Sequence, residues 1–136
     1  MLSKNVKNDI EAQGMKSCHI RDAVALCEFA AHIEEEIQNG AEDWTEISAS
    51  QLLADYRSQQ NHSKGLSFTT IAAFGQNSAV IHYTPTEETD AKIDKSGLFL
   101  VDSGGQYLDG TTDVTRTFHY GNPTPKQVRQ KVAKSL

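Results

Sequence analysis

The spacing of the apolar residues changes midway along the chain. In the first part they recur at steps of three and four, which places on one helix face Ala23, Leu26, Cys27, Ala30, Ile33 and Ile37. From Leu66 onward, short runs rich in Thr, Ile, Phe and Val lie between Gly, Pro, Asn and Asp turn signals, as in strands. Helices followed by strands predict an α+β domain, with long N-terminal helices packed on an antiparallel sheet.

Local signals give the ends of three helices. Asn8 and Glu11 have the form of a capping box that starts the first helix, and Gly40 ends it. A second helix is expected from Thr45 to about residue 60, and a third begins within residues 124–127. Gly14 lies inside the first helix, where glycine costs ~1 kcal/mol relative to alanine, and we expect a bend there.

Four stretches have the composition of strands. Residues 66–74 and 79–83 predict two strands joined by a turn at 75–78, and residues 84–96 are polar and predict a loop. Residues 98–101 form a buried type of strand that runs into Asp102. A further strand, 112–120, follows the dipeptide Asp109-Gly110, which is a strong hairpin signal.

Composition excludes several kinds of partner. The formal net charge of −5 argues against nucleic acid, which needs clustered Lys and Arg. The sequence has neither a secretory core nor a run of ~18 apolar residues, so no membrane association is expected and the protein should be cytoplasmic. Cys18 and Cys27 are too far apart to share a helix face, and both are interpreted as packing cysteines.

Asp102 and Asp113 are the candidate metal ligands. If Asp109-Gly110 is a two-residue turn, Asp113 faces Gln106 and both acids lie on one face of the sheet. They would then be ~13 Å apart along the strand. A register shift of two residues, from a longer turn or a bulge at residues 104–105, would reduce this to ~7 Å, and we predict such a shift. Spacing alone favours ordinary turn aspartates that bond backbone amides.

Three motifs give the chain a resemblance to a known family. They are residues 77–83 (NSAVIHY), 101–104 (VDSG) and 109–117 (DGTTDVTRT). In order and spacing they resemble the Xaa-Pro aminopeptidases of the pita-bread metallopeptidase group, and residues 6–26 are similar too. The resemblance implies that residues 1–136 are the first half of a pita-bread catalytic domain, with the second half missing.

The resemblance also implies a chemistry. Members of this family are hydrolases that remove the N-terminal residue from peptides with proline at the second position, using water activated by two divalent ions, usually manganese. By motif, Asp102 and Asp113 match two of the five metal ligands, and His82 matches a catalytic histidine that faces the substrate. The other three ligands, a histidine and two glutamates, belong to segments that would follow residue 136. We therefore expect weak or no metal binding and no activity from the chain alone.

Other interpretations stay open at this stage. Without its motif, His82 is typical of a strand histidine satisfied by a neighbour. His119 is taken as structural, Arg116 as a surface ion pair at least as readily as a site residue, and residues 34–36 as a solvated acidic face. Besides a truncated aminopeptidase, the chain fits a non-catalytic pita-bread-like binding module. It also fits a homodimer in which a second copy replaces the missing half.

Overall fold

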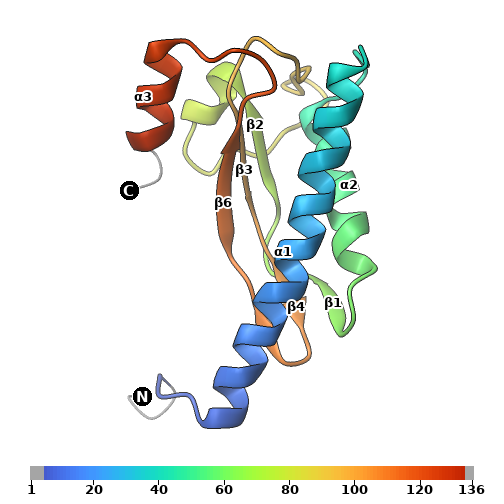
Figure 1. Cartoon of the computed structure of the whole chain (residues 1–136), viewed down its shortest axis with the longest axis vertical. Coiled ribbons are helices and arrows are strands. Elements are labelled where there is room, and N and C mark those ends of the chain that lie inside the picture. The colour runs from blue at the N-terminus through green and yellow to red at the C-terminus, as the bar shows by residue number, and fades with distance from the viewer. Residues whose placement is uncertain (1–4, 134–136) are drawn as a thin grey trace.

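Helices and a long antiparallel ribbon form two layers. The computed structural model describes the backbone of residues 5–133 and the side chains of residues 5–129. Helices α1 (Asp9–Gln38) and α2 (Glu46–Ser58) lie together against the strands, and α3 (Pro125–Ala133) lies at one end of the sheet, on the side away from them (Figure 1). The predicted α+β class is confirmed.

The predicted helix ends are confirmed by their caps. The Asn8 side chain accepts from the Glu11 amide at 2.9 Å, and the Glu11 carboxylate accepts from the Asn8 amide at 3.0 Å. Gly40 follows the last turn of α1 with a left-handed φ of 94°, which favours glycine. Thr45 caps α2 through Ser48 in the same reciprocal way.

Gly14 has a packing role in α1. A Cβ atom at this position would overlap the backbone carbonyl oxygen of Asp109, in the hairpin turn that lies against the helix. Cys18, one turn further along, is fully buried beside Gly110 of the same hairpin. Glycine is therefore needed here for close approach of the backbone, and the bend expected at Gly14 stays a prediction.

The strands form two three-stranded antiparallel sheets. The first has the order β2 (Ile71–Phe74), β3 (Phe99–Ser103) and β6 (Val114–Phe118). The second has the order β1 (Ser63–Leu66), β4 (Gly105–Tyr107) and β5 (Gly110–Thr111). Because β3 leads into β4 and β5 leads towards β6, the sheets form a continuous ribbon that ends in a hairpin beside α1 (Figure 1).

One strand prediction was wrong in its extent, and another was wrong altogether. Residues 66–74 are split between β1 and β2, which belong to different sheets. Residues 79–83 contain no strand: a short 3₁₀ helix, η2 (Gly75–Ala79), follows β2, and an irregular segment comes after it. The physical reason is that Asn77 and Tyr83 bond a buried carboxylate of α2 rather than a neighbouring strand.

The core lies between the two helices and the first sheet. Fully or almost fully buried side chains meet there from α1, α2 and β3: Phe29, Ile33, Leu53, Phe99 and Val101. Both cysteines are free. Cys18 is buried as expected, whereas Cys27 is exposed, so the packing prediction was wrong for Cys27. Within the described part of the chain, no helix has the length and apolar character to cross a membrane.

Gly14→Ala tests the close approach between α1 and the hairpin. In a solvent-exposed helix this change would stabilise the fold by ~1 kcal/mol. Here the added methyl group would overlap the Asp109 carbonyl. We expect the free energy of unfolding, measured in urea, to fall instead of rise. The exposed neighbour Gln13→Ala is the control and should change stability by no more than ~0.5 kcal/mol. A stabilised Gly14→Ala variant would contradict this packing.

Candidate metal centre

Asp102 projects from the sheet face opposite the helices. Along β3, residues alternate between the two faces, and Phe99 and Val101 enter the core. Asp102 has the opposite parity and is partly exposed. The hydroxyl of Thr115, directly across on β6, donates to Asp102 Oδ1 at 2.8 Å. This bond fixes one carboxylate oxygen and leaves Oδ2 without a bond inside the described residues.

The hairpin register brings Asp113 toward Asp102. Tyr107 pairs with Gly110, so the turn residues are Leu108-Asp109, one position earlier than predicted. This moves the register by two residues, and Asp102 lies opposite Thr115. Asp113 is exposed and lies two residues before Thr115, or ~7 Å along a strand. The predicted shift is confirmed, but its cause is the position of the turn and not a longer turn or a bulge at residues 104–105.

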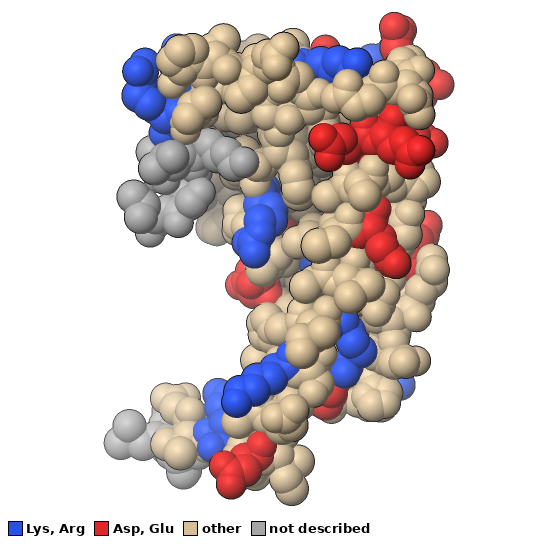
Figure 2. Space-filling view, viewed as in Figure 1, with Lys and Arg blue, Asp and Glu red and all other residues tan. Residues whose placement is uncertain are grey.

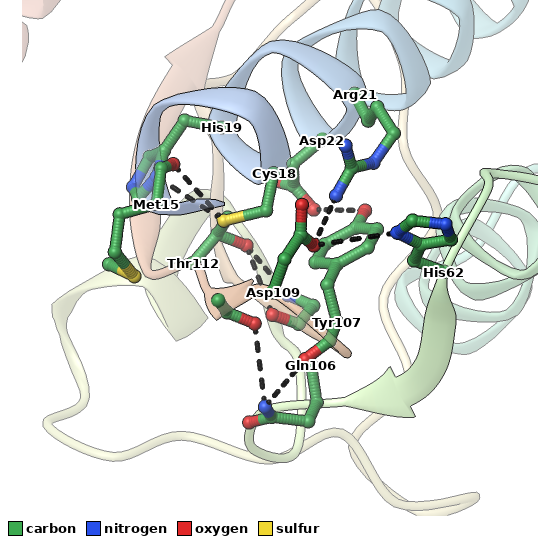
Figure 3. Close-up of polar contacts among 12 residues, drawn as sticks. Met15, Cys18, His19, Arg21, Asp22, His62, Gln106, Tyr107, Asp109 and Thr112 are labelled. Carbon is green, nitrogen blue, oxygen red and sulfur yellow. Dashed lines mark hydrogen bonds and ion pairs between the residues drawn. The ribbon is translucent and has the colours of Figure 1, made fainter. Parts of the chain in front are cut away.

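A buried ion pair anchors this hairpin to both helices. Arg57 of α2 donates from Nε and Nη2 to the two carboxylate oxygens of Asp22 of α1, at 2.8 and 3.0 Å. The hydroxyl of Tyr107 on β4 donates to Asp22 Oδ1 at 3.0 Å (Figure 3). Asp22 is 3% exposed and Arg57 1%. One carboxylate therefore ties three elements together.

Asp22 remains ionised in this buried position. Burial raises its pKa, but the hydrogen bonds and charge of Arg57, with the hydroxyls of Tyr107 and Thr112, outweigh this and hold the pKa below its ordinary value. The pKa of the Tyr107 phenol is shifted in the other direction. Burial and the Asp22 charge raise the pKa of Tyr107 well above its usual range.

The turn has a second anchor at its tip. Arg21 of α1 forms an ion pair with Asp109, and its guanidinium lies 5.3 Å from the centre of the Tyr107 ring. The hydrogen bond from Arg21 lowers the pKa of Asp109. Figure 3 shows Arg21 and Asp22 pointing from α1 toward the hairpin. These contacts hold Leu108-Asp109 as the turn and so maintain the register.

Three backbone segments lie close together beside Asp113. At Gly104 a Cβ atom would overlap both the carbonyl oxygen of Thr112 and the hydroxyl of Ser67. Ser67 donates to that carbonyl at 2.8 Å, and the Gly105 amide donates to the Thr112 hydroxyl at 2.8 Å. The backbone on either side of Asp113 is therefore held to its neighbours.

His82 lies on the irregular segment after η2. It is exposed and has a left-handed φ of 55°, so the interpretation as a strand histidine was wrong. Within residues 5–129 its side chain has no hydrogen bond or ion pair with either aspartate. His119 accepts from the Gly121 amide at 3.0 Å, in keeping with a structural role. Arg116 donates to the Thr115 carbonyl, and in the described residues it has no ion pair.

The donor set fits part of a divalent-cation site. Carboxylate oxygens are hard ligands that suit Mg²⁺ or Mn²⁺. In the part of the chain that the structure describes, no group of three or more His, Cys, Asp or Glu side chains is placed to hold a metal ion. Asp102 and Asp113 therefore fit as a contribution to such a site and not as a complete one.

Sequence reasoning missed the buried charged residues that organise this region. Asp22, Glu46 and Arg57 are all almost fully buried, and none was singled out. A signal was present, because each is placed at helical spacing from a buried apolar residue: Asp22 four before Leu26, Glu46 three before Ala49, and Arg57 four after Leu53. A charged residue on a core-facing stripe indicates a buried partner.

Comparison with known proteins agrees with this fold. Residues 13–135 match metallopeptidase family M24. Xaa-Pro aminopeptidase 1 of Dictyostelium discoideum is 54% identical over 130 residues, covering 94% of this chain and 21% of that protein. The Xaa-Pro aminopeptidase ApepP of Drosophila melanogaster is 52% identical over 124 residues, covering 91% and 20%.

Solved structures of aminopeptidases have the same fold as this chain. The X-prolyl aminopeptidase of Caenorhabditis elegans, described as a cytosolic enzyme with a di-nuclear active site, superimposes with a TM-score of 0.87. It is 44% identical, and the match covers 91% of this chain and 20% of that one. The X-Pro aminopeptidase of Thermotoga maritima has the same fold, with a TM-score of 0.74 at 24% identity.

The α+β chain with its paired carboxylates belongs to metallopeptidase family M24, and the pita-bread assignment is confirmed. It spans about one fifth of the length of the curated relatives that it matches.

Arg57→Met tests the anchor of the hairpin. The change leaves Asp22 buried without its cation, so we expect a loss of about 3–5 kcal/mol in the free energy of unfolding. The double variant Asp22→Asn/Arg57→Met removes both charges and keeps an acceptor for Tyr107. It should recover part of that loss. A single variant as stable as the parent chain would contradict the role of the pair.

The same pair predicts how stability depends on pH. Because the folded pKa of Asp22 lies below its ordinary value of 3.8, the unfolded chain takes up this proton first on acidification. The stabilisation is present above the unfolded pKa and is lost as pH falls through the folded one. In urea unfolding between pH 5 and pH 3, the parent chain should lose more free energy than Asp22→Asn/Arg57→Met. Parallel losses would contradict the shift.

Proposed function

We propose that this chain is the first, metal-binding part of the catalytic domain of an Xaa-Pro aminopeptidase, and that residues 1–136 are an incomplete pita-bread domain. The observation that carries the proposal is the register that brings Asp113 within about two residues of Asp102 on an open sheet face. It is supported by more than 50% identity to two proteins with that activity in their names.

In this proposal Asp102 and Asp113 are metal ligands. They would contribute carboxylate oxygens to two divalent ions, with manganese as the expected native metal. Bound ions of this kind activate water and polarise the scissile carbonyl. Thr115 orients Asp102 by its hydrogen bond to Oδ1, which leaves Oδ2 available.

His82 is proposed as the catalytic residue that this chain supplies. Its ring is exposed on a loop, and an imidazole N–H that donates to the carbonyl oxygen of a bound peptide would stabilise developing negative charge. The proposed substrates are peptides with proline at the second position, and the proposed location is cytoplasmic. On the face in Figure 2, acidic side chains gather at the upper right and basic ones are scattered without forming one large patch, in keeping with no nucleic-acid partner.

The chain is proposed to be inactive alone. Two carboxylates hold a divalent ion only weakly, because sites for such ions use more ligands. The homodimer of half-domains and the non-catalytic binding module are the alternatives, and the first experiment separates all three.

That experiment measures metal binding and turnover on the same sample. Mn²⁺ should broaden the NMR signals of residues near Asp102, including Thr115, and Asp102→Asn should abolish the effect. Asp55→Asn, at an exposed carboxylate on α2, is the control and should change nothing. No hydrolysis of an Xaa-Pro peptide is expected with Mn²⁺.

Each other outcome has a clear meaning. Absence of any broadening, even at a Mn²⁺ concentration high enough to fill weak sites, would overturn the ligand roles and favour the binding module. Chelator-sensitive hydrolysis that is lost in Asp102→Asn would show that copies assemble a working site, as the homodimer requires.

A further inference from the structure

We propose that Glu46 is a positioning residue. Its buried carboxylate holds the segment from Phe74 to Ala91 in the conformation that presents His82 to solvent. The role of His82 in this inference rests on the proposed function. The claim that Glu46 holds the segment does not.

Four donors from this segment converge on one carboxylate. Oε1 accepts from the Phe74 amide at 2.6 Å, and Oε2 accepts from the Tyr83 hydroxyl at 2.6 Å and the Ala91 amide at 3.2 Å. The side-chain amide of Asn77 lies 3.0 and 3.1 Å from the two oxygens. The donors are spread over both ends and the middle of the segment, so one side chain holds it at several points. Backbone amides add bonds near its ends, from Gly75 to the Leu98 carbonyl and from Glu46 to the Ala91 carbonyl.

The carboxylate is buried without a cation. Glu46 is fully buried, and within the described residues it forms no salt bridge. A carboxylate in such a place is costly unless hydrogen bonds replace its water. The neutral donors do so, and its position as the first residue of α2 adds the favourable field of the helix N-terminus. The arrangement is reciprocal, because those donors are themselves buried or partly buried and have this carboxylate as an acceptor.

The anchor decides which side chains face outward. Tyr83 is 8% exposed because its hydroxyl reaches Glu46, whereas its neighbour Ile81 is 85% exposed. His82 lies between them, exposed, with a positive φ. Positive φ is uncommon for residues other than glycine, and here it accompanies the turn of the chain between an outward and an inward side chain.

The anchor also returns the segment to the edge of β2. Thr84 and Pro85 line an apolar hollow of about 250 Å³ together with Thr69 and Thr70, which precede β2. The other neighbour of β2 is β3, where Asp102 pairs with Ile71 at the same end. The path set by Glu46 thus carries the chain that contains His82 from the far end of β2 back toward the end at which Asp102 lies.

Glu46→Gln separates this role from packing. The variant keeps the shape of the side chain, but its NH₂ group would face donors and only one oxygen would remain to accept. Tyr83→Phe is a milder second variant that removes one donor. Glu42→Gln, at an exposed carboxylate four residues earlier, is the control.

Hydrogen exchange of the whole chain is the test. In Glu46→Gln we expect exchange of the Phe74 and Ala91 amides to accelerate about tenfold to a hundredfold, with a smaller increase in Tyr83→Phe. The His82 ring signals should move toward those of an unstructured histidine. The amides that pair β3 with β6, and all sites in Glu42→Gln, should be unchanged.

Unchanged exchange in Glu46→Gln would overturn the proposal. So would an equal increase over the whole chain in both Glu46→Gln and Tyr83→Phe, because the residue would then serve general stability.

Broadening of NMR signals by Mn²⁺ distinguishes positioning of His82 from a purely structural role of Glu46. In the parent chain, broadening of the His82 ring relative to Thr115 reports how near the loop lies to the metal. Glu46→Gln should reduce it at His82 and leave it at Thr115, and equal broadening in both proteins would count against positioning. If Mn²⁺ broadens nothing in the parent chain, the proposed metal site fails while the exchange result still decides the role of Glu46.

Discussion

A buried ion pair between Asp22 of α1 and Arg57 of α2 joins both helices to the hairpin. Removing either charge would leave the other buried without a partner, which is among the most destabilising single changes in a folded chain. Through Tyr107 the pair holds β4 against the helices, and Arg21 and Asp109 hold the turn. The position of that turn sets the register that brings Asp113 toward Asp102.

Glu46 is a second buried carboxylate, and it is stabilised in a different way. It is surrounded by neutral hydrogen-bond donors where Asp22 has a guanidinium, and the segment it holds is irregular. Both acids belong to the helical layer, yet each organises backbone that lies on or beside the sheet. The helices therefore do more than cover the core, because their buried carboxylates also hold the hairpin and the segment that contains His82.

The geometry and the membership of metallopeptidase family M24 agree on the fold. Asp102 on β3 and Asp113, directly before β6, lie close together along the ribbon, and the chain spans about one fifth of the length of its curated relatives. A partial ligand set on a well-anchored ribbon is consistent with a domain whose site is completed from elsewhere. The proposed catalytic role depends on that completion.

The sequence by itself determined the three helices and the strand that leads into Asp102, because capping boxes and apolar spacing act within three or four residues. By motif it also picked out Asp102, Asp113 and His82 as candidates. Only the tertiary structure decided the turn at Leu108-Asp109 and the irregular segment at residues 80–83. These depend on contacts such as Arg21 to Asp109 and Tyr83 to Glu46, between residues distant in the sequence. Local propensity favours Asp109-Gly110 as the turn and a strand at 79–83, but the free energy of pairing the partly buried Arg21 and Asp109 and of satisfying the buried Glu46 carboxylate outweighs it.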